Sequence, residues 1–124
     1  MGLSSLPAVP AAAVPHPLPP ELVELVAHRF RLLGEPMRIR LLDRLRNGEA
    51  TVNELSSALG ASQQNVSKHL GVLTDVGILG RRKDGNHVYY RIVDEGVFGL
   101  CEQVCGSMRR QLATLSATVA GADS

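Results

Sequence analysis

Apolar residues recur every three or four positions over most of the chain, and this spacing is typical of amphipathic helices. It predicts four successive helices, over residues 21–33, 36–46, 52–59 and 63–76. Thr51 has Glu54 three residues further on, which is the spacing of a helix-capping box. Gly60 is predicted to end the third helix, and Ser62 is predicted to cap the fourth. Because only Gly60 and Ala61 separate these two helices, we expect a helix-turn-helix.

After Gly77 the apolar period changes from that of a helix to that of a strand. Residues 78–83 and 87–92 are predicted to form a β-hairpin, because residues 84–86 suit a tight turn. A last helix is predicted from about Glu95, and it carries a long apolar stripe: Val97, Leu100, Cys101, Val104, Met108, Leu112, Leu115 and Val119. The predicted fold is mainly α with a small β-hairpin, a winged helix-turn-helix with helical extensions.

Composition narrows the classes of protein. Hydrophobic residues are 44% of the 124 positions and charged residues 20%, which excludes a chain that is disordered throughout. No apolar run approaches the roughly 20 residues of a membrane helix, so no membrane partner is expected. Two cysteines are too few for a disulfide scaffold, which favours a cytoplasmic protein. The sequence has no glycine-rich phosphate loop and no catalytic His or Cys arrangement, so we expect no enzyme.

Six of the seven prolines fall in the first 20 residues, which contain no charged side chain. Such a segment cannot form a helix, so residues 1–20 are predicted to be a flexible Pro/Ala-rich arm. Residues 21–118 are predicted to be a winged helix domain for DNA binding and dimerisation, and residues 119–124 a C-terminal tail.

Over residues 63–71, the outward face of the fourth predicted helix carries amides and hydroxyls but no carboxylate. If Val66 and Leu70 point inward, the helical period directs these residues outward or to the flanks: Gln63, Gln64, Asn65, Ser67, Lys68 and Gly71. Such side chains can hydrogen-bond to base edges in the major groove of DNA. The alternative is an ordinary solvated face, which usually mixes charges of both signs. His69 lies on the flank nearer the core. We expect with equal weight that it packs or orients neighbouring groups, or that it contacts a phosphate.

Basic residues gather in the predicted wing. They are Arg81, Arg82, Lys83 and Arg91. A basic hairpin beside an amide-rich helix fits contact with the phosphate backbone, which adds affinity rather than sequence reading. The alternative is a strand edge that charge protects from aggregation. The two features together favour double-stranded DNA as a partner.

Several motifs together resemble the ArsR/SmtB family of bacterial winged helix repressors, over about residues 21–115. The matching segments are residues 33–42, 52–55, 62–70, 73–79 and 82–91. The resemblance implies a homodimer, formed by the first and last helices, that binds an inverted-repeat operator and releases it when a ligand binds. It also implies that the base-reading residues are Gln63, Gln64, Ser67 and Lys68.

The metal sites of that family do not match this sequence. One site needs a Cys-x-Cys motif in the third helix, and residues 54–59 contain no cysteine. The other needs four ligands on the last helix, and only Asp94 matches, because Gly96, Ser107 and Arg110 occupy the remaining positions. Zinc sensing by either route is not expected.

Cys101 and Cys105 are four residues apart on one side of the last predicted helix. Their Cβ atoms should be about 5–6 Å apart, whereas a relaxed disulfide needs about 3.8 Å. A sulfur-extended bridge or a soft metal fits that gap better, and a two-fold partner could bring a second pair nearby. The equal alternative is that both thiols only pack. The cofactor is therefore a soft metal ion or a metalloid, or the protein has no cofactor and the thiols themselves sense the signal. An oxidant also remains open as that signal.

These observations favour a sequence-specific repressor that binds its operator as a homodimer and is released by an inducer at Cys101 and Cys105. The last helix keeps an apolar stripe longer than one small domain can cover, which supports a dimer. One alternative is a winged helix that binds another protein through its basic patch. Another is a DNA-binding regulator without a sensor, in which the cysteines are structural.

Overall fold

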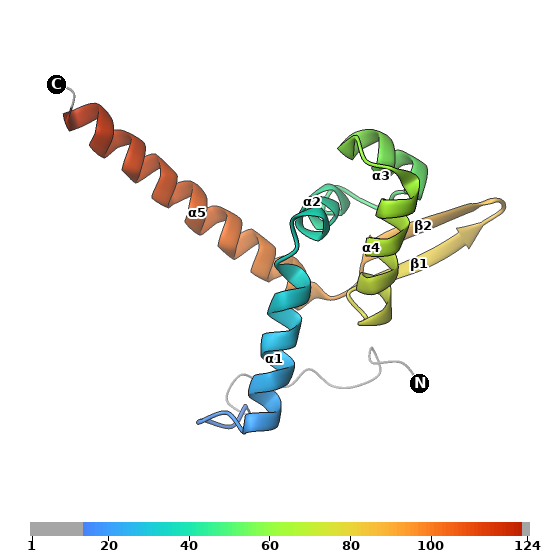
Figure 1. Cartoon of the computed structure of the whole chain (residues 1–124), viewed down its shortest axis with the longest axis horizontal. Helices are drawn as coiled ribbons and strands as arrows, with labels where there is room; N and C mark the ends of the chain where they lie inside the picture. Colours follow the sequence, from blue (N-terminus) through green and yellow to red (C-terminus); the bar gives the residue numbers. More distant parts are fainter. Residues whose placement is uncertain (1–13, 123–124) are drawn as a thin grey trace. The chain divides into compact units, whose positions relative to one another are not determined.

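The computed structural model describes residues 14–122, with side chains described as far as residue 118 (Figure 1). The chain divides into two compact units after Gly34. Most of the predicted N-terminal arm, residues 1–13, lies outside the described residues, as do residues 123–124 of the predicted tail and the side chain of Val119. The division into arm, domain and tail stays a prediction.

The first unit contributes one helix, α1, which spans Pro20–Leu33. Pro20 occupies the first turn, where its missing N–H costs no hydrogen bond, and the helix begins one residue before the predicted position. At the other end, the N–H of Gly34 donates to the carbonyl of Phe30 at 2.8 Å. Several apolar side chains of α1 are exposed: Val23, Leu25, Val26 and Phe30.

The second unit contains the remaining elements in the predicted order. They are α2 (Pro36–Leu45), α3 (Val52–Leu59), α4 (Gln63–Asp75), β1 (Leu79–Asp84), β2 (His87–Ile92) and α5 (Glu95–Ala122). In Figure 1, α3 and α4 are joined by a short turn, and the hairpin projects beside α4. The predicted fold class, a mainly α winged helix-turn-helix, is confirmed.

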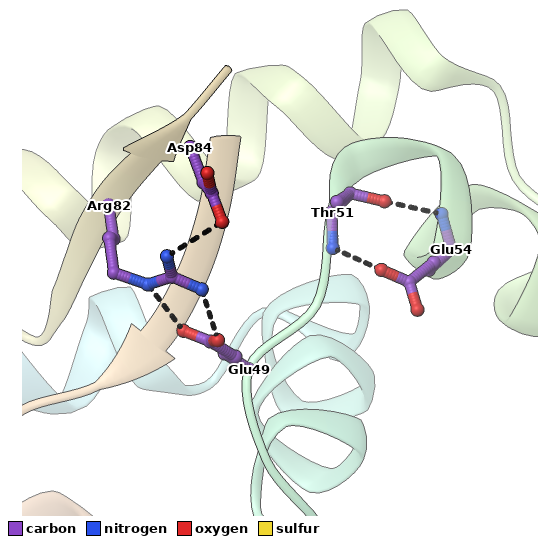
Figure 2. A network of polar contacts seen from close by, with 5 residues as sticks. All are labelled: Glu49, Thr51, Glu54, Arg82 and Asp84. Atoms are coloured by element: carbon purple, nitrogen blue, oxygen red, sulfur yellow. Dashed lines mark hydrogen bonds and ion pairs between the residues drawn. The ribbon is translucent and has the colours of Figure 1, made fainter. Parts of the chain in front are cut away.

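Local capping fixes the turn between α3 and α4. Thr51 and Glu54 form the predicted capping box, with the Thr51 hydroxyl 3.2 Å from the Glu54 nitrogen and the Glu54 carboxylate 3.0 Å from the Thr51 nitrogen (Figure 2). Gly60 has a φ of 63°, a left-handed conformation that favours glycine and ends α3. The Ser62 hydroxyl then accepts a hydrogen bond from the Asn65 nitrogen at 3.1 Å and starts α4.

Leucines from α2, α3, α4 and the wing form the core. The largest fully buried side chains are Leu41, Leu42, Leu55, Val66, Leu70, Leu73, Ile78 and Leu79. Burial of each such side chain stabilises the fold by about 1.5–3 kcal/mol. A change of Leu70 to alanine should therefore cost about 2–5 kcal/mol, because the resulting cavity cannot fully collapse.

The hairpin is antiparallel, with Arg81 opposite Tyr90 and Arg82 opposite Tyr89. Its second edge is also paired, because Ala50 and Tyr90 exchange backbone hydrogen bonds of 3.1 and 2.8 Å. Tyr90 is buried at this junction. The wing is therefore attached to the segment between α2 and α3, as its small size requires.

The long helix α5 is buried only near its start. Val97 is buried, and its nitrogen donates to the Asp94 carboxylate at 3.1 Å. Further along, apolar side chains are exposed: Val104, Met108, Leu112 and Leu115. Among the described residues, no helix has the length and apolar character needed to cross a membrane.

Candidate nucleic-acid interface

The N-terminal half of α4 presents a polar face to solvent. Gln63, Gln64, Ser67 and Lys68 are exposed, whereas Val66 and Leu70 on the opposite side are fully buried. Within residues 14–122, no recorded hydrogen bond or ion pair engages the side chains of those four residues. Asn65 is half-exposed at the flank. The structure therefore leaves the predicted base-reading side chains available to a ligand, and their role in DNA reading stays a prediction.

His69 lies on the inner flank of α4 and is only 7% exposed. Its Nδ1 accepts a hydrogen bond from Arg38 Nε at 3.2 Å, and the backbone nitrogen of Arg38 donates to the Glu35 carboxylate at 3.0 Å. Nδ1 lies 3.8 Å from that carboxylate, too far for a hydrogen bond, and a nitrogen that accepts a proton cannot also donate one. This geometry favours the orienting role of His69 over the phosphate contact, because the ring is buried.

The wing arginines and lysine differ in their surroundings. Arg81, Lys83 and Arg91 are exposed. Arg82 instead contacts Glu49 through two nitrogens, with Nη2 at 2.6 Å and Nε at 3.3 Å from the two carboxylate oxygens (Figure 2). This hydrogen bonding lowers the pKa of Glu49. The predicted basic cluster therefore contains one arginine that already has an acidic partner.

Sequence reasoning missed Glu49 as a member of this site. It lies 33 residues from Arg82 in the chain and just before the Thr51 cap. A single acidic residue at the end of a turn carries no periodic signal. The contact between Glu49 and Arg82 forms because Ala50 pairs with Tyr90, which brings this segment beside the wing.

A second cluster joins the end of α2 to α5 beside the two cysteines. Arg46 Nη2 contacts the Glu102 carboxylate, and the guanidinium lies 5.8 Å from the centre of the Phe98 ring. Cys101 is half-buried and Cys105 is exposed, and neither forms a disulfide. Burial raises the pKa of the Cys101 thiol, although the nearby Arg46 charge opposes this effect. The sequence predicted the thiol pair but gave no signal for the arginine beside it.

No group of three or more His, Cys, Asp or Glu side chains in the described part of the chain has the arrangement of a metal site. Both thiols lie on α5, four residues apart, as the sequence predicted. The sensor role of this pair stays a prediction.

The chain is similar to several known transcription regulators. A family model described as a helix-turn-helix domain matches residues 33–82. The HTH-type transcriptional regulator KmtR of Mycobacterium tuberculosis is 37% identical over 83 residues, which are 67% of this chain and 64% of that protein. The matched part of this chain thus spans slightly less than two thirds of that relative.

Two solved structures extend the comparison to the fold. The crystal structure of the antimony-specific transcriptional repressor AntR has a TM-score of 0.73 at 29% identity and covers 88% of this chain and 99% of its own. The solution structure of the homodimeric winged helix domain of Mb0332 from Mycobacterium bovis, a possible ArsR-family regulator, has a TM-score of 0.68 at 30% identity. It covers 74% of this chain and 85% of its own.

The order of helices and strands, with the matched helix-turn-helix region, defines a winged helix-turn-helix domain. The chain belongs to the ArsR/SmtB family of winged helix repressors. The resemblance seen in the sequence motifs is thereby confirmed.

Proposed function

We propose that this protein is a transcriptional repressor that binds an operator in double-stranded DNA as a homodimer. The observation that carries the proposal is the polar, unpaired N-terminal half of α4. In helix-turn-helix proteins this end of the second helix enters the major groove. We propose that the protein acts in the cytoplasm and is not an enzyme.

Base reading is assigned to four side chains of α4: Gln63, Gln64, Ser67 and Lys68. The amide of glutamine can form two hydrogen bonds with adenine, whereas lysine can reach guanine or a phosphate. Asn65 lies at the edge of this face, where its backbone nitrogen is already bonded to Ser62. Buried Val66 and Leu70 fix the rotation of the helix about its axis, so the polar face has one orientation on the domain.

A second copy of the chain is the partner that suits α5. Exposed apolar side chains recur along the helix at a helical spacing: Val104, Met108, Leu112 and Leu115. A two-fold axis would cover this stripe with its own copy and present two α4 helices to successive major grooves. Such an arrangement reads an inverted repeat. The homodimeric winged helix domain of Mb0332 supports this proposal.

The site that senses the inducer is assigned to Cys101 and Cys105. The inducer itself is a thiol-reactive species or a soft metal. The antimony-specific repressor AntR supports a soft metalloid as one candidate class. Arg46 links α2 to α5 within the same cluster, so a change at the thiols has a direct path to the DNA-binding body. Partial burial of Cys101 favours the alternative in which that thiol only packs.

The experiment is a mobility-shift assay on the duplex upstream of the protein's own gene, with a scrambled duplex as control. It is repeated with zinc, cadmium, copper(I), arsenite, persulfide and peroxide. A specific complex that one of these agents dissociates supports repressor and inducer together. Specific binding that none of these agents changes supports a repressor without a thiol sensor. Equal, weak binding to both duplexes supports a protein-binding winged helix instead.

A further inference from the structure

The segment before α3 pairs with the outer edge of β2 through a single bridge. Ala50 pairs with Tyr90 in an antiparallel bridge, so the preceding residue, Glu49, lies opposite Arg91. Side chains of opposed residues share a face, and alternate residues of a strand share it too. Glu49, Tyr89 and Arg82 therefore lie on one face of the sheet.

Arg82 is held on that face by contacts on several sides. Its fork-shaped guanidinium meets both oxygens of Glu49, at 2.6 and 3.3 Å, and its Nη1 lies 3.4 Å from Asp84 (Figure 2). The guanidinium carbon also lies 4.7 Å from the centre of the Tyr89 ring. A two-pronged contact fixes orientation more strongly than a single ion pair.

The flanking basic residues have a different environment. Arg81 and Lys83 alternate with Arg82 along β1, so both lie on the opposite face of the hairpin. Both are exposed, and the described residues offer neither of them a carboxylate within ion-pair distance. These two cations can bind a phosphate without first losing a partner.

We infer that Arg82 is a positioning residue, which with Glu49 braces the wing against the segment between α2 and α3, while Arg81 and Lys83 bind the DNA backbone. The inference rests on the proposed DNA binding, and it gives Arg82 a different role from the phosphate contact that the sequence predicted. A phosphate bound at the Nε and Nη2 edge of Arg82 would displace Glu49 from that edge. It would also leave the Glu49 carboxylate unpaired beside the negative DNA backbone.

The test compares four variants with the wild-type protein: Arg82→Gln, Glu49→Gln, the double variant, and Lys83→Gln. Lys83→Gln is the matched control, because it removes one positive charge from the adjacent position of the same strand. Binding to a short random-sequence duplex is measured at several salt concentrations, since phosphate contacts need no specific sequence.

For Lys83→Gln, the slope of log affinity against log salt should fall by about one to two in the dimer, which has two wings. For Arg82→Gln and Glu49→Gln, affinity should fall by about threefold to tenfold with the slope unchanged. The double variant should bind DNA no more weakly than either single variant, because the two substitutions remove the same contact. An Arg82→Gln slope that falls as in Lys83→Gln would overturn the inference. Tighter binding by Glu49→Gln, with a steeper slope of log affinity against log salt, would also overturn the inference.

A measurement without DNA separates this inference from the proposed function. In the free protein, thermal unfolding of these variants, with a Glu49→Gln/Lys83→Gln double variant added, should show coupling between Glu49 and Arg82. It should show none between Glu49 and Lys83. The pKa of Glu49 is lowered by Arg82, so the coupling should be present near neutral pH. It should be lost as pH falls below the ordinary range of a carboxyl group. Absence of coupling at neutral pH would refute the brace even if the wild-type protein binds its operator.

Discussion

The helices α4 and α5 leave opposite kinds of surface uncovered. On α4 the inner face is buried, and the exposed side chains of the N-terminal half are amides, a hydroxyl and a lysine. On α5 the polar residues and the apolar residues beyond the first turns are both exposed. A polar face without internal partners suits a polar ligand, whereas an apolar stripe in water suits a protein surface. In the proposed function, the domain presents α4 to DNA and α5 to its own copy.

This contrast also separates specificity from assembly. In the proposed dimer each α4 reads one half-site, so affinity for an inverted repeat would depend on the second copy that α5 recruits. In this proposal the wing adds a third kind of contact, to phosphate, which would depend on salt but not on sequence. Changes on the three surfaces should therefore produce different losses.

The largest effect is expected from Leu112→Glu, which places a charge in the middle of the exposed apolar stripe of α5. The variant should be monomeric, because burial of an unpaired carboxylate at an interface is costly. Its operator affinity should approach that for non-specific DNA, about a thousandfold weaker. Sedimentation and anisotropy measure both properties.

The matched control for assembly is Ala117→Glu. Ala117 is also exposed, but the helical period directs it away from the stripe. This variant should remain dimeric and bind the operator normally. A wild-type protein that is monomeric at micromolar concentration would remove the basis of this account of α5.

An intermediate effect is expected from Gln64→Ala on the polar face of α4. The variant should lose roughly 1–3 kcal/mol of binding free energy on the operator, because its contact with a base edge is gone. Affinity for a random duplex should barely change. Gln103→Ala, an exposed glutamine of α5, serves as control and should bind both duplexes like the wild type. An unchanged operator affinity for Gln64→Ala would show that a different face of α4 meets the DNA.

The smallest effect on DNA affinity is expected from the cysteines. Without an inducer, Cys101→Ser and Cys105→Ser should bind the operator like the wild type, because neither residue faces DNA. If the pair is the sensor, each variant should fail to release DNA with the agent that dissociates the wild-type complex. A double alanine variant that still responds would exclude the pair.

Alkylation sharpens the distinction between the two thiols. Cys105 is exposed, whereas burial raises the pKa of Cys101. Because the thiolate is the reactive form, iodoacetamide should modify Cys105 first at neutral pH. The rate at Cys101 should keep rising with pH beyond the ordinary titration range of a thiol. Faster modification of Cys101 at neutral pH would contradict the burial seen at this position.

Much of the fold could be predicted from the sequence, because its signals are local. Helical spacing, the capping box at Thr51 and the glycine at position 60 located the ends of α3 and the start of α4. The same spacing identified which side of α4 is exposed, since Val66 and Leu70 are on the buried side.

Contacts between distant residues could not be predicted in this way. The partners of Arg82, Arg46 and His69 lie 33, 56 and 31 residues away in the chain, as Glu49, Glu102 and Arg38. No periodicity links such pairs, because they depend on how elements pack. Each contact changes the interpretation of a basic or titratable residue that composition alone would assign to phosphate or to solvent.

The central claim is that the exposed face of α4 reads DNA sequence. The most direct measurement compares affinity of the wild-type dimer for the duplex upstream of its gene with that for a scrambled duplex, at physiological salt. We predict a preference of at least about a thousandfold. In Gln64→Ala, that preference should shrink while binding to the scrambled duplex stays constant. Equal affinity of the wild-type protein for the two duplexes would contradict the account.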